Sequence, residues 1–479
     1  MAPKTITPVT IFSPPCYNFG MSIDNETPPD NRKIRIHNPQ ELAELACSLS
    51  LDLPISEDLS LLAQPVRVGN CIVPNSLAIH PMEGCDGDLL GRPGPLTVRR
   101  YERYAAGGAG LIWVEAIAVV PEGRANPRQL WMHEQSYDSI AAMVARIRVL
   151  AAERFGQKHR PFLVAQLTHS GRYSRAGAER NPQILQHDPY RDAKMNLPAD
   201  WPVVSDEYLD GLPQAFVQAA RLAFKAGFDA VDVKACHGYL LTELLASHTR
   251  PGKHGGPFEN RIRLILDIID RIRAELGEGK IITTRLGVFD AIPHPYGWGV
   301  DKGDYTQPNL AEPKRLIDLF VRRGMPMVNV TIASPYYNPH YGRPFNTPAR
   351  GAYESPEHPL VGVARIIGLA GQIQKAFPQT AIIGTGYSWL GTLMPYVAAG
   401  VKKEGLATII GLGRMSFAYP DFAADIIQHG RLDPGKICIA CSGCTQIMRD
   451  GGMAGCPVRD KEVYGSIYRK GLKGEFKGS

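Results

Sequence analysis

Four of the nine cysteines in this chain lie close together near its C-terminus. They follow a C-x2-C-x2-C-x11-C spacing and are Cys438, Cys441, Cys444 and Cys456. Three thiolates at short spacing, followed by a distant fourth, can enclose a [4Fe–4S] cluster. Four cysteines also bind zinc tetrahedrally, so zinc stays open as an alternative, as does a segment without metal. In a chain without an expected export signal, this clustering indicates a metal site before it indicates disulfides. The other cysteines are scattered and are Cys16, Cys47, Cys71, Cys85 and Cys236.

A second set of residues that can do chemistry follows short apolar runs, at the places where strands would end. It combines carboxylates, cations, amides, an imidazole and a phenol. The set comprises His80, Glu83, Glu115, Gln166, Lys234, His237, Tyr239, Arg285, Asn329 and Thr331. Because the carboxyl ends of parallel barrel strands meet at one face, we expect these side chains to form a ring around one site.

Two glycine-rich turns follow the last two apolar runs. They are Gly384–Gly386, with the sequence GTG, and Gly411–Arg414, with the sequence GLGR. Glycines let backbone N–H groups approach a phosphate, and barrels commonly bind phosphate after strands seven and eight. Each turn alone is equally consistent with a tight connection between a strand and a helix. Together they favour a phosphorylated ligand.

Eight apolar, β-branched runs must position these side chains. The expected strands are Ser76–His80, Gly110–Ala116, Phe162–Leu167, Ala230–Lys234, Ile281–Leu286, Met327–Thr331, Ala381–Gly384 and Ala407–Gly411. Helical patterns lie between them, at Ser139–Arg154, Pro213–Ala226, Arg261–Leu276, Ala311–Arg323, Leu360–Ala376 and Thr392–Ala399. Apolar strands that alternate with helices are typical of parallel β/α units. Eight such units predict an α/β fold of the (β/α)8 TIM barrel type, with another α/β fold as the alternative.

Composition and patterning divide the chain into three expected parts. These are an N-terminal extension over 1–65 with a short helix near Pro39–Leu49, the barrel over 66–430, and a cysteine-rich tail over 431–479. The 479 residues carry 53 Lys and Arg against 47 Asp and Glu, which gives no support for nucleic-acid binding. The chain has no apolar run long enough to span a bilayer, and its first residues do not resemble a signal peptide. We therefore expect a cytoplasmic protein without a membrane or nucleic-acid partner.

Four ordered segments resemble the old yellow enzyme family of NADH:flavin oxidoreductases. They are PNSLAIHPMEG from Pro74, AQLTHSGR from Ala165, DVKACHGYLLTELLASHTRPGKHGGPFENR from Asp232 and TIIGLGRMSFAYPDF from Thr408. The resemblance runs from about Val66 to the C-terminus. It implies a TIM barrel that binds FMN as its cofactor.

The resemblance also implies which residues hold the flavin. Gln166 would hydrogen-bond the pyrimidine side of the isoalloxazine ring. Arg285 would lie near N1 and the C2 carbonyl, where a cation stabilises the anionic reduced flavin. The residues lining the ring would be Pro81, Met82 and Ala116. The residues holding the phosphate would be Gly386, Gly413 and Arg414, since Arg suits bidentate contact with phosphate.

On the substrate side, the family uses a pair of donors to bind a carbonyl or phenolate oxygen. The matching positions are Lys234 and His237, and Lys234 departs from the commoner His. Tyr239, two residues after the second donor, would protonate the α-carbon. The resemblance therefore implies reduction of the activated C=C bond of a small unsaturated carbonyl compound, with hydride from flavin N5.

Glu83 is a further departure, because the family commonly places Thr or Cys there, near the N5 edge of the flavin. An ionised carboxylate at that edge disfavours the reduced anion, whereas a protonated one can donate a proton. We expect Lys234 to pair with Glu83 across the barrel. After the sixth strand, Tyr336 and Tyr337 either reach the substrate or form an aromatic lid without chemistry.

The cysteine motif resembles that of a cluster-bearing branch of the family, which includes trimethylamine dehydrogenase and 2,4-dienoyl-CoA reductase. In that branch the middle gap is often one residue longer. Relatives continue into dinucleotide-binding domains, and no G-x-G-x-x-G motif follows the cysteines here. We expect electrons to come from a separate reductase subunit, from ferredoxin or directly from NAD(P)H.

Two other functions stay open on the sequence. One is an amine- or alcohol-type dehydrogenase that passes electrons out through the cluster. The other is an electron-transfer subunit of a larger reductase complex, in which the barrel relays charge. A homo-oligomer also stays open.

Overall fold

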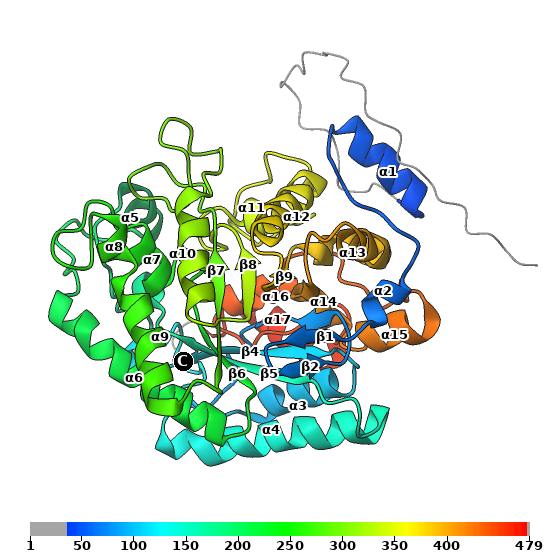
Figure 1. The fold of residues 1–479 in the computed structure, drawn as a ribbon, viewed down its shortest axis with the longest axis horizontal. Coiled ribbons are helices and arrows are strands. Elements are labelled where there is room, and N and C mark those ends of the chain that lie inside the picture. The colour runs from blue at the N-terminus through cyan, green and yellow to red at the C-terminus, as the bar shows by residue number, and fades with distance from the viewer. Residues whose placement is uncertain (1–35, 477–479) are drawn as a thin grey trace, which may run out of the picture.

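Eight parallel strands close into a barrel in the computed structural model, which describes residues 36–476. Neighbouring strands follow the order β10-β3-β4-β5-β6-β7-β8-β9 (Figure 1). Their bounds are β3 Leu77–Ile79, β4 Leu111–Ala118, β5 Phe162–Thr168, β6 Ala230–Val233, β7 Ile281–Gly287, β8 Met327–Thr331, β9 Ala381–Gly384 and β10 Ile409–Leu412. Each expected strand overlaps one of these, so the predicted (β/α)8 barrel is confirmed.

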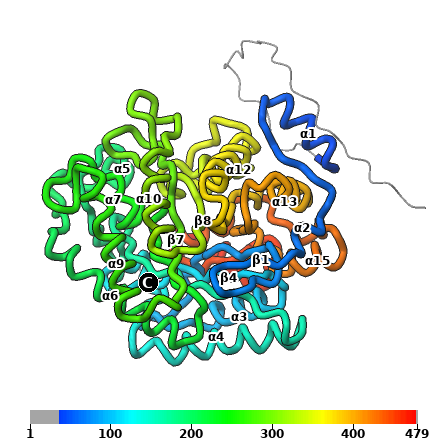
Figure 2. The backbone as a smooth tube through the Cα atoms, in the orientation of Figure 1, coloured from blue at the N-terminus to red at the C-terminus, as the bar shows by residue number. Residues whose placement is uncertain are grey.

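The barrel strands are buried over their whole length, which explains their continuous apolar sequences. Helices surround the strands (Figure 2). Their buried apolar residues join those of the strands in one core. The main ones are α3 Pro95–Ala105, α4 Glu134–Phe155, α6 Asp206–Lys225, α9 Arg263–Leu276, α10 Ala311–Arg322, α12 Pro359–Ala376 and α13 Met394–Lys403. All of these except α3 match an expected helix.

Short helices lie mostly in the connections that follow the strands. They are η1 Pro121–Gly123, η2 Gly171–Tyr173, α5 Pro189–Met195, α7 Leu240–Leu245, α8 Phe258–Arg261, α11 Pro339–Gly342, η3 Tyr387–Leu393 and α14 Arg414–Ala418. The connection between β8 and α12 carries Tyr336 and Arg343.

An antiparallel hairpin of β1 Val66–Val68 and β2 Cys71–Val73 precedes the barrel. Val68 and Val73 pack with inward side chains of the strands, including Trp113, and close the amino end of the barrel. The sequence pattern did not indicate this hairpin. Two helices come before it, α1 Pro39–Ser48, which matches the expected short helix, and α2 Ser60–Ala63.

The C-terminal tail contains α15 Phe422–His429, α16 Gly443–Arg449 and α17 Lys461–Leu472, coloured orange to red in Figure 1. It is attached to the barrel by long-range contacts. The Ala454 N–H donates to the Gly84 carbonyl at 2.6 Å, and Asp460 forms an ion pair with Arg99 at 2.7 Å. The tail therefore packs on the loop after β3, which carries Glu83.

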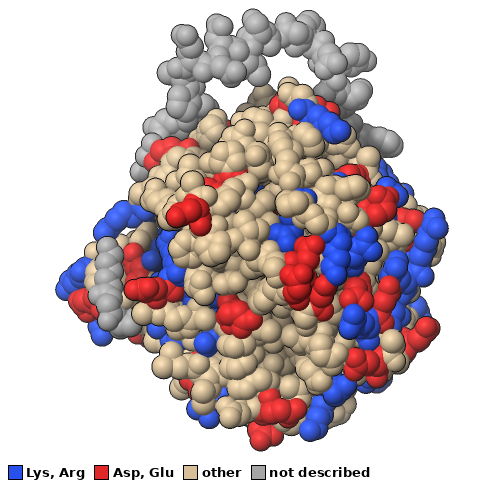
Figure 3. Space-filling model, turned by 90° about the vertical axis from the view of Figure 1, so that its left-hand side faces the viewer, with Lys and Arg blue, Asp and Glu red and all other residues tan. Residues whose placement is uncertain are grey.

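Charge is mixed on the face that Figure 3 shows, where acidic and basic side chains are interspersed around a broad area without charged groups. Within residues 36–476, no helix is both long enough and apolar enough to cross a bilayer. Expectations that concern residues 1–35, including Cys16, lie outside the described residues.

Candidate active site

The carboxyl ends of the strands bring Glu83, Lys234 and Tyr239 together. The Tyr239 hydroxyl donates to Glu83 Oε1 at 3.1 Å, and Lys234 Nζ lies 3.7 Å from the same oxygen. Lys234 Nζ also lies 3.7 Å from the centre of the Tyr239 ring. The predicted Lys234–Glu83 pair is therefore confirmed, and Tyr239 completes it.

Tyr336 extends this group, because its hydroxyl lies 3.1 Å from that of Tyr239. Its ring stacks on Tyr173 of η2 at 4.2 Å between centroids. Tyr239 is buried, whereas Tyr336 is partly exposed. Tyr337 lies elsewhere, with its ring 5.2 Å from Lys194 Nζ. Only the first of the two expected tyrosines therefore reaches the group, and Tyr173 joins it without having been anticipated.

His237 is buried and has a backbone φ of +66°, in the left-handed region that non-glycine residues rarely adopt. The Ser334 hydroxyl donates to the His237 carbonyl at 3.1 Å and holds this turn. Burial lowers the pKa of His237 well below 6.5, and the cations Arg285 and Lys234 lower it further. The imidazole is therefore neutral near pH 7 and offers an N–H donor without carrying charge.

Asp232 organises the strand ends from inside the barrel. Its carboxylate accepts from Gln166 Nε2 at 2.6 Å, from Trp113 Nε1 at 2.8 Å and from the Arg285 backbone N–H at 2.7 Å. Burial raises the pKa of Asp232 to about 6. Asp232 fixes the plane of the Gln166 amide, a role that the sequence signalled only by a carboxylate inside an apolar strand.

Arg285 and Arg414 are buried cations without a carboxylate partner among the described residues. Arg285 is 6% exposed, burial lowers its pKa, and its Nε has no hydrogen-bond partner. Arg414 Nη2 donates to the Pro344 carbonyl at 2.5 Å, while its buried Nη1 has no partner. Burying an unpaired charge is costly. These guanidinium groups therefore fit an anionic ligand.

The two glycine turns lie beside these cations. Gly386 has a φ of +99°, and a Cβ there would lie 3.0 Å from Ile366 Cδ1. A Cβ on Gly413 would lie 3.1 Å from Met82 Sδ, so the backbone approaches Met82 closely. Both turns need glycine, as expected for a close approach of backbone to a ligand.

The remaining expected ring-lining residues lie on the first two barrel strands and their loops. Pro81 directly follows the end of β3, beside Met82. Ala116 lies inside β4, where its carbonyl accepts from Gln129 Nε2 at 3.2 Å. The structure thus brings the predicted residues to one end of the barrel.

A buried ion network supports the loop that carries Glu83. Arg100 of α3 contacts both Asp86 and Glu115, and the Gly84 N–H donates to Glu115 Oε2 at 3.0 Å. Burial raises the pKa of Glu115 to about 7, against the opposing effect of Arg100. The network holds Gly84 next to Glu83. The sequence singled out Glu115 as a strand-end residue but did not indicate Arg100.

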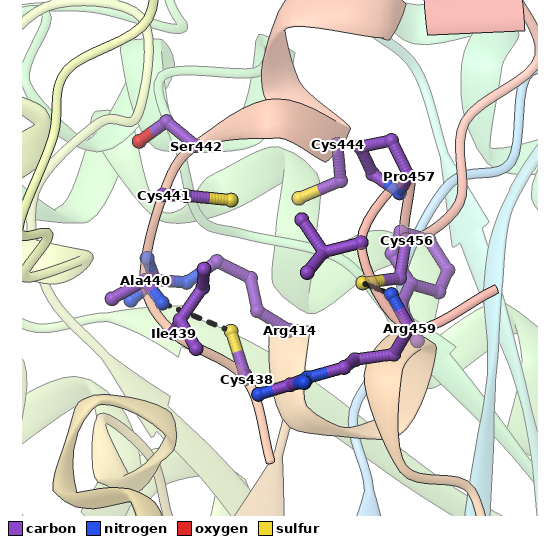
Figure 4. A pocket seen from close by; sticks show the side chains of 12 residues that line it. Arg414, Cys438, Ile439, Ala440, Cys441, Ser442, Cys444, Cys456, Pro457 and Arg459 are labelled. Carbon is purple, nitrogen blue, oxygen red and sulfur yellow. Dashed lines mark hydrogen bonds between the residues drawn. The ribbon is translucent and has the colours of Figure 1, made fainter. Parts of the chain in front are cut away.

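All four clustered cysteines line one cavity, with their sulfur atoms turned toward a shared space (Figure 4). The Ala440 N–H donates to Cys438 Sγ at 3.4 Å, and the Arg459 N–H donates to Cys456 Sγ at 3.3 Å. In the described part of the chain, no three His, Cys, Asp or Glu side chains converge as on a single metal ion. No disulfide joins the cysteines of that part either.

Comparison with known families identifies the barrel. A model described as the NADH:flavin oxidoreductase / NADH oxidase family matches residues 61–303, half of the chain. The chain belongs to this family. The old yellow enzyme resemblance predicted from four segments is confirmed.

Two relatives within the NADH:flavin oxidoreductase family show how much of the chain is shared. NADPH dehydrogenase of Halalkalibacterium halodurans is 32% identical over 216 residues, covering 45% of this chain and 58% of that protein. NADH oxidase of Thermoanaerobacter brockii is 25% identical over 391 residues, covering 79% of this chain and 52% of that protein. The matched parts thus span little more than half the length of these relatives.

Solved structures share the fold of this flavin oxidoreductase. A complex of 2-naphthoyl-CoA reductase aligns at a TM-score of 0.67 and 19% identity, over 86% of this chain and 58% of that one. An old yellow enzyme homologue from Zymomonas mobilis aligns at 0.56 and 19%, over 78% and 94%. Histamine dehydrogenase from Rhizobium sp. 4-9 aligns at 0.62 and 20%, over 85% and 53%. At these identities the likeness concerns the fold alone.

Proposed function

We propose that this flavin oxidoreductase reduces the activated C=C bond of an unsaturated carbonyl compound. The observation that carries the proposal is the Tyr239 hydroxyl, which lies between Glu83 and Tyr336 and under the cation of Lys234. FMN, when bound, supplies a hydride equivalent at N5 for the β-carbon. The protein must then bind the carbonyl oxygen and deliver one proton to the α-carbon.

The residues that would hold FMN fit an anionic, phosphorylated cofactor. Arg285 and Arg414 are buried cations that no carboxylate of residues 36–476 pairs with, and Gln166 presents an amide oriented by Asp232. Gly386 and Gly413 let the backbone come close to the phosphate, while Met82 lies against Gly413. We assign the ring side to Gln166 and Arg285.

Lys234 and His237 would bind the substrate oxygen. Reduction places negative charge on that oxygen, and a fixed ammonium with a neutral imidazole N–H stabilises this charge in a site that excludes water. Glu83 contacts both Lys234 and Tyr239 and so holds these two side chains together. The compact charge of Lys234 replaces the commoner His at this position.

Tyr239 would donate the proton to the α-carbon and regain it from Tyr336. Burial and the carboxylate of Glu83 raise the pKa of Tyr239 well above 10, so its hydroxyl stays protonated at neutral pH. Tyr336 is partly exposed and can exchange its proton with water. Hydride at the β-carbon and a proton at the α-carbon complete the reduction of the double bond.

The same contacts argue against the alternatives. An amine substrate bound as its ammonium ion is repelled by Lys234, which already lies over the Tyr239 ring. A pure electron relay needs no proton donor, whereas Tyr239 and Tyr336 form a hydrogen-bonded pair of donors. Reduction of the activated C=C bond therefore has the stronger support.

We further propose that the four cysteines hold a [4Fe–4S] cluster. The sulfurs line one cavity and two of them accept backbone N–H groups, which suits a polynuclear centre. Zinc, which needs four sulfurs at about 2.3 Å from one ion, stays the alternative for the same four cysteines. The proposed centre suits the reducing cytoplasm.

The electron donor is proposed to be NAD(P)H, by analogy with the relatives named NADPH dehydrogenase and NADH oxidase. A ferredoxin or a separate reductase subunit, acting through the cysteine centre, is the second candidate. Anaerobic reduction with NADH, NADPH or reduced ferredoxin distinguishes these donors.

Replacement of Tyr239 tests the proposed reaction. With cyclohex-2-enone as substrate, Tyr239→Phe is expected to lower kcat by about 10²-fold or more, the usual effect of losing a general acid. Reduction of the bound FMN by its donor should stay unchanged, because the phenol is not needed for it. Rapid-mixing absorbance measurements separate the two half-reactions.

The matched control is Tyr337→Phe, which removes a hydroxyl from the loop that carries Tyr336, away from the group. It is expected to keep full turnover. If Tyr239→Phe reduces the enone as fast as the unmodified protein, the proposed proton donor is wrong.

A further inference from the structure

Arg343 is an arginine that neither the sequence motifs nor the proposed reaction uses. It follows α11 in the loop between β8 and α12, and its Nη1 donates to Thr445 Oγ1, next to Cys444. Its Nε is buried without a hydrogen-bond partner. Burial and the neighbouring Arg414 lower its pKa, while the thiols of Cys444 and Cys438 oppose this. The guanidinium therefore lies against the cysteine centre.

The loop holds this position through further contacts with the cysteine segment. The Asn346 N–H donates to the Ala440 carbonyl at 3.0 Å, and Asn346 Nδ2 donates to the Ile439 carbonyl at 3.2 Å. Trp389 Nε1 in turn donates to Asn346 Oδ1 at 2.7 Å. Arg343 is thus carried by a loop that is fastened to the segment between Cys438 and Cys441.

Arg343 and Arg414 form a pair of like charges that no described carboxylate neutralises. Arg414 lines the cysteine cavity itself, and it donates to the carbonyl of Pro344, the residue after Arg343 (Figure 4). Arg414 is buried and Arg343 half-buried, and an adjacent anion stabilises two like charges in such a place. The four cysteine sulfurs are a candidate for this anion, because Arg414 lines their cavity and Arg343 contacts Thr445, the residue after Cys444.

We propose that Arg343 neutralises charge on the four-cysteine centre and raises the reduction potential of that centre. The inference rests on the proposed [4Fe–4S] cluster. Four thiolates outweigh the charge of the iron–sulfur core, so the centre is anionic and each added electron makes it more so. A fixed cation nearby stabilises the reduced form more than the oxidised one. One electron enters from an external reductant, and no bond or proton changes at Arg343.

The FMN phosphate is the other anion that could attract this guanidinium. Arg343 contacts Thr445 in the tail, on the cysteine side, whereas the glycines expected to hold phosphate contact Ile366 and Met82. We therefore assign Arg343 to the cysteine centre and let the experiment compare both anions.

The test is an anaerobic potentiometric titration of the holoprotein with dithionite, followed by the EPR signal of the reduced centre. Iron, sulfide and FMN contents are measured on the same samples. Arg343→Gln is expected to disfavour one-electron reduction at least tenfold, a shift of about 59 mV to lower potential. FMN content should stay unchanged.

Three further variants isolate the role of the buried charge. Arg343→Lys keeps the cation and should recover at least half of the shift. Thr445→Val removes the hydrogen bond but leaves Arg343 charged, so the potential should stay near the original. Arg449→Gln removes an exposed cation at the end of α16 and should change reduction less than threefold, because water screens it.

The outcomes separate this inference from the proposal on which it rests. A potential in Arg343→Gln equal to that of the unmodified protein overturns the inference, as does loss of FMN with the potential unchanged. If Arg343→Gln assembles no centre, Arg343→Lys decides: a Lys variant that retains the centre supports the role, and one that fails equally overturns it. Unmodified protein without iron and sulfide contradicts the proposed cluster instead.

Discussion

Buried arginines lie in two regions of this barrel, and the regions differ in whether a carboxylate contacts the guanidinium group. Around α3 and β4, Arg100 contacts Asp86 and Glu115, while in η2 Arg172 contacts Glu243 at 2.6 Å. At the carboxyl ends of the last strands, Arg285 and Arg414 have no carboxylate partner in residues 36–476. The first region neutralises its own charge, and the second does not.

The difference separates charge that serves the fold from charge that serves a ligand. A buried ion pair with good geometry is largely neutral and positions backbone, as Arg100 does for Gly84 through Glu115. A buried cation without an acid raises the free energy of the empty protein and lowers it again when an anion binds. Arg285 and Arg414 therefore fit the places where we propose that FMN and the cysteine centre contact the chain.

The largest effect is expected where a paired cation is removed. Arg100→Met leaves Asp86 and Glu115 buried without compensation, which should cost about 3–5 kcal/mol of unfolding free energy at pH 7. Urea unfolding of the protein without FMN measures this loss. Arg146→Met, at an exposed ion pair, is the control and should cost less than about 1 kcal/mol.

The pH dependence of that loss has a defined sign. The pKa of Glu115 is about 7 in the folded protein and about 4.3 in the unfolded chain, so the folded state binds the proton more tightly. Stability from this group is complete below about pH 4 and is lost as the pH rises through 7. Without Arg100 the unfolding free energy should fall more steeply as the pH rises. A pH-independent cost would contradict the assigned ion network.

An intermediate effect is expected where an unpaired cation is removed. Arg285→Met should weaken FMN binding about 10- to 100-fold, since a charge-assisted hydrogen bond contributes about 1.5–3 kcal/mol. The protein without FMN should be as stable as before or more so, because no carboxylate loses a partner. Fluorescence titration with FMN and urea unfolding measure the two quantities. Equal loss of stability in Arg285→Met and Arg100→Met would erase the distinction between the two regions.

The barrel could be predicted because its strands repeat one signal. Strands such as Ile281–Gly287 are buried on both faces, so each forms a continuous apolar run that is visible without knowledge of its neighbours. Helix α3 was missed for the opposite reason. It buries Arg100, Tyr101 and Tyr104, so a charged residue interrupts the apolar periodicity of its sequence. The acid partners of Arg100 lie on other elements, and the local sequence therefore does not show that this charge is buried.

The site could be predicted only as far as the motifs named its residues. Residue types at strand ends indicated Lys234, Glu83 and Tyr239, and the pairing across the barrel followed from their charges. Tyr173 and Arg343 join the site through loops of irregular length. Their contacts depend on how those loops fold over the barrel, which no local pattern encodes.

The smallest effect is expected on a neutral neighbour of the unpaired cations. Burial is the main reason that the pKa of His237 lies well below 6.5, and the charge of Arg285 adds to it. Arg285→Met should therefore raise the pKa of His237 only in part, so that it stays below 6.5. The imidazole remains neutral at pH 7 in both proteins, and the pH profile of enone reduction should show no inflection near 6.5. NMR of the labelled ring nitrogens measures the shift directly.

A pKa that does not change would place the charge of Arg285 too far from His237 to act on the substrate oxygen. A rise above 6.5 would mean that the cations, rather than burial, keep the imidazole neutral, and the donor side would then respond to pH near neutrality.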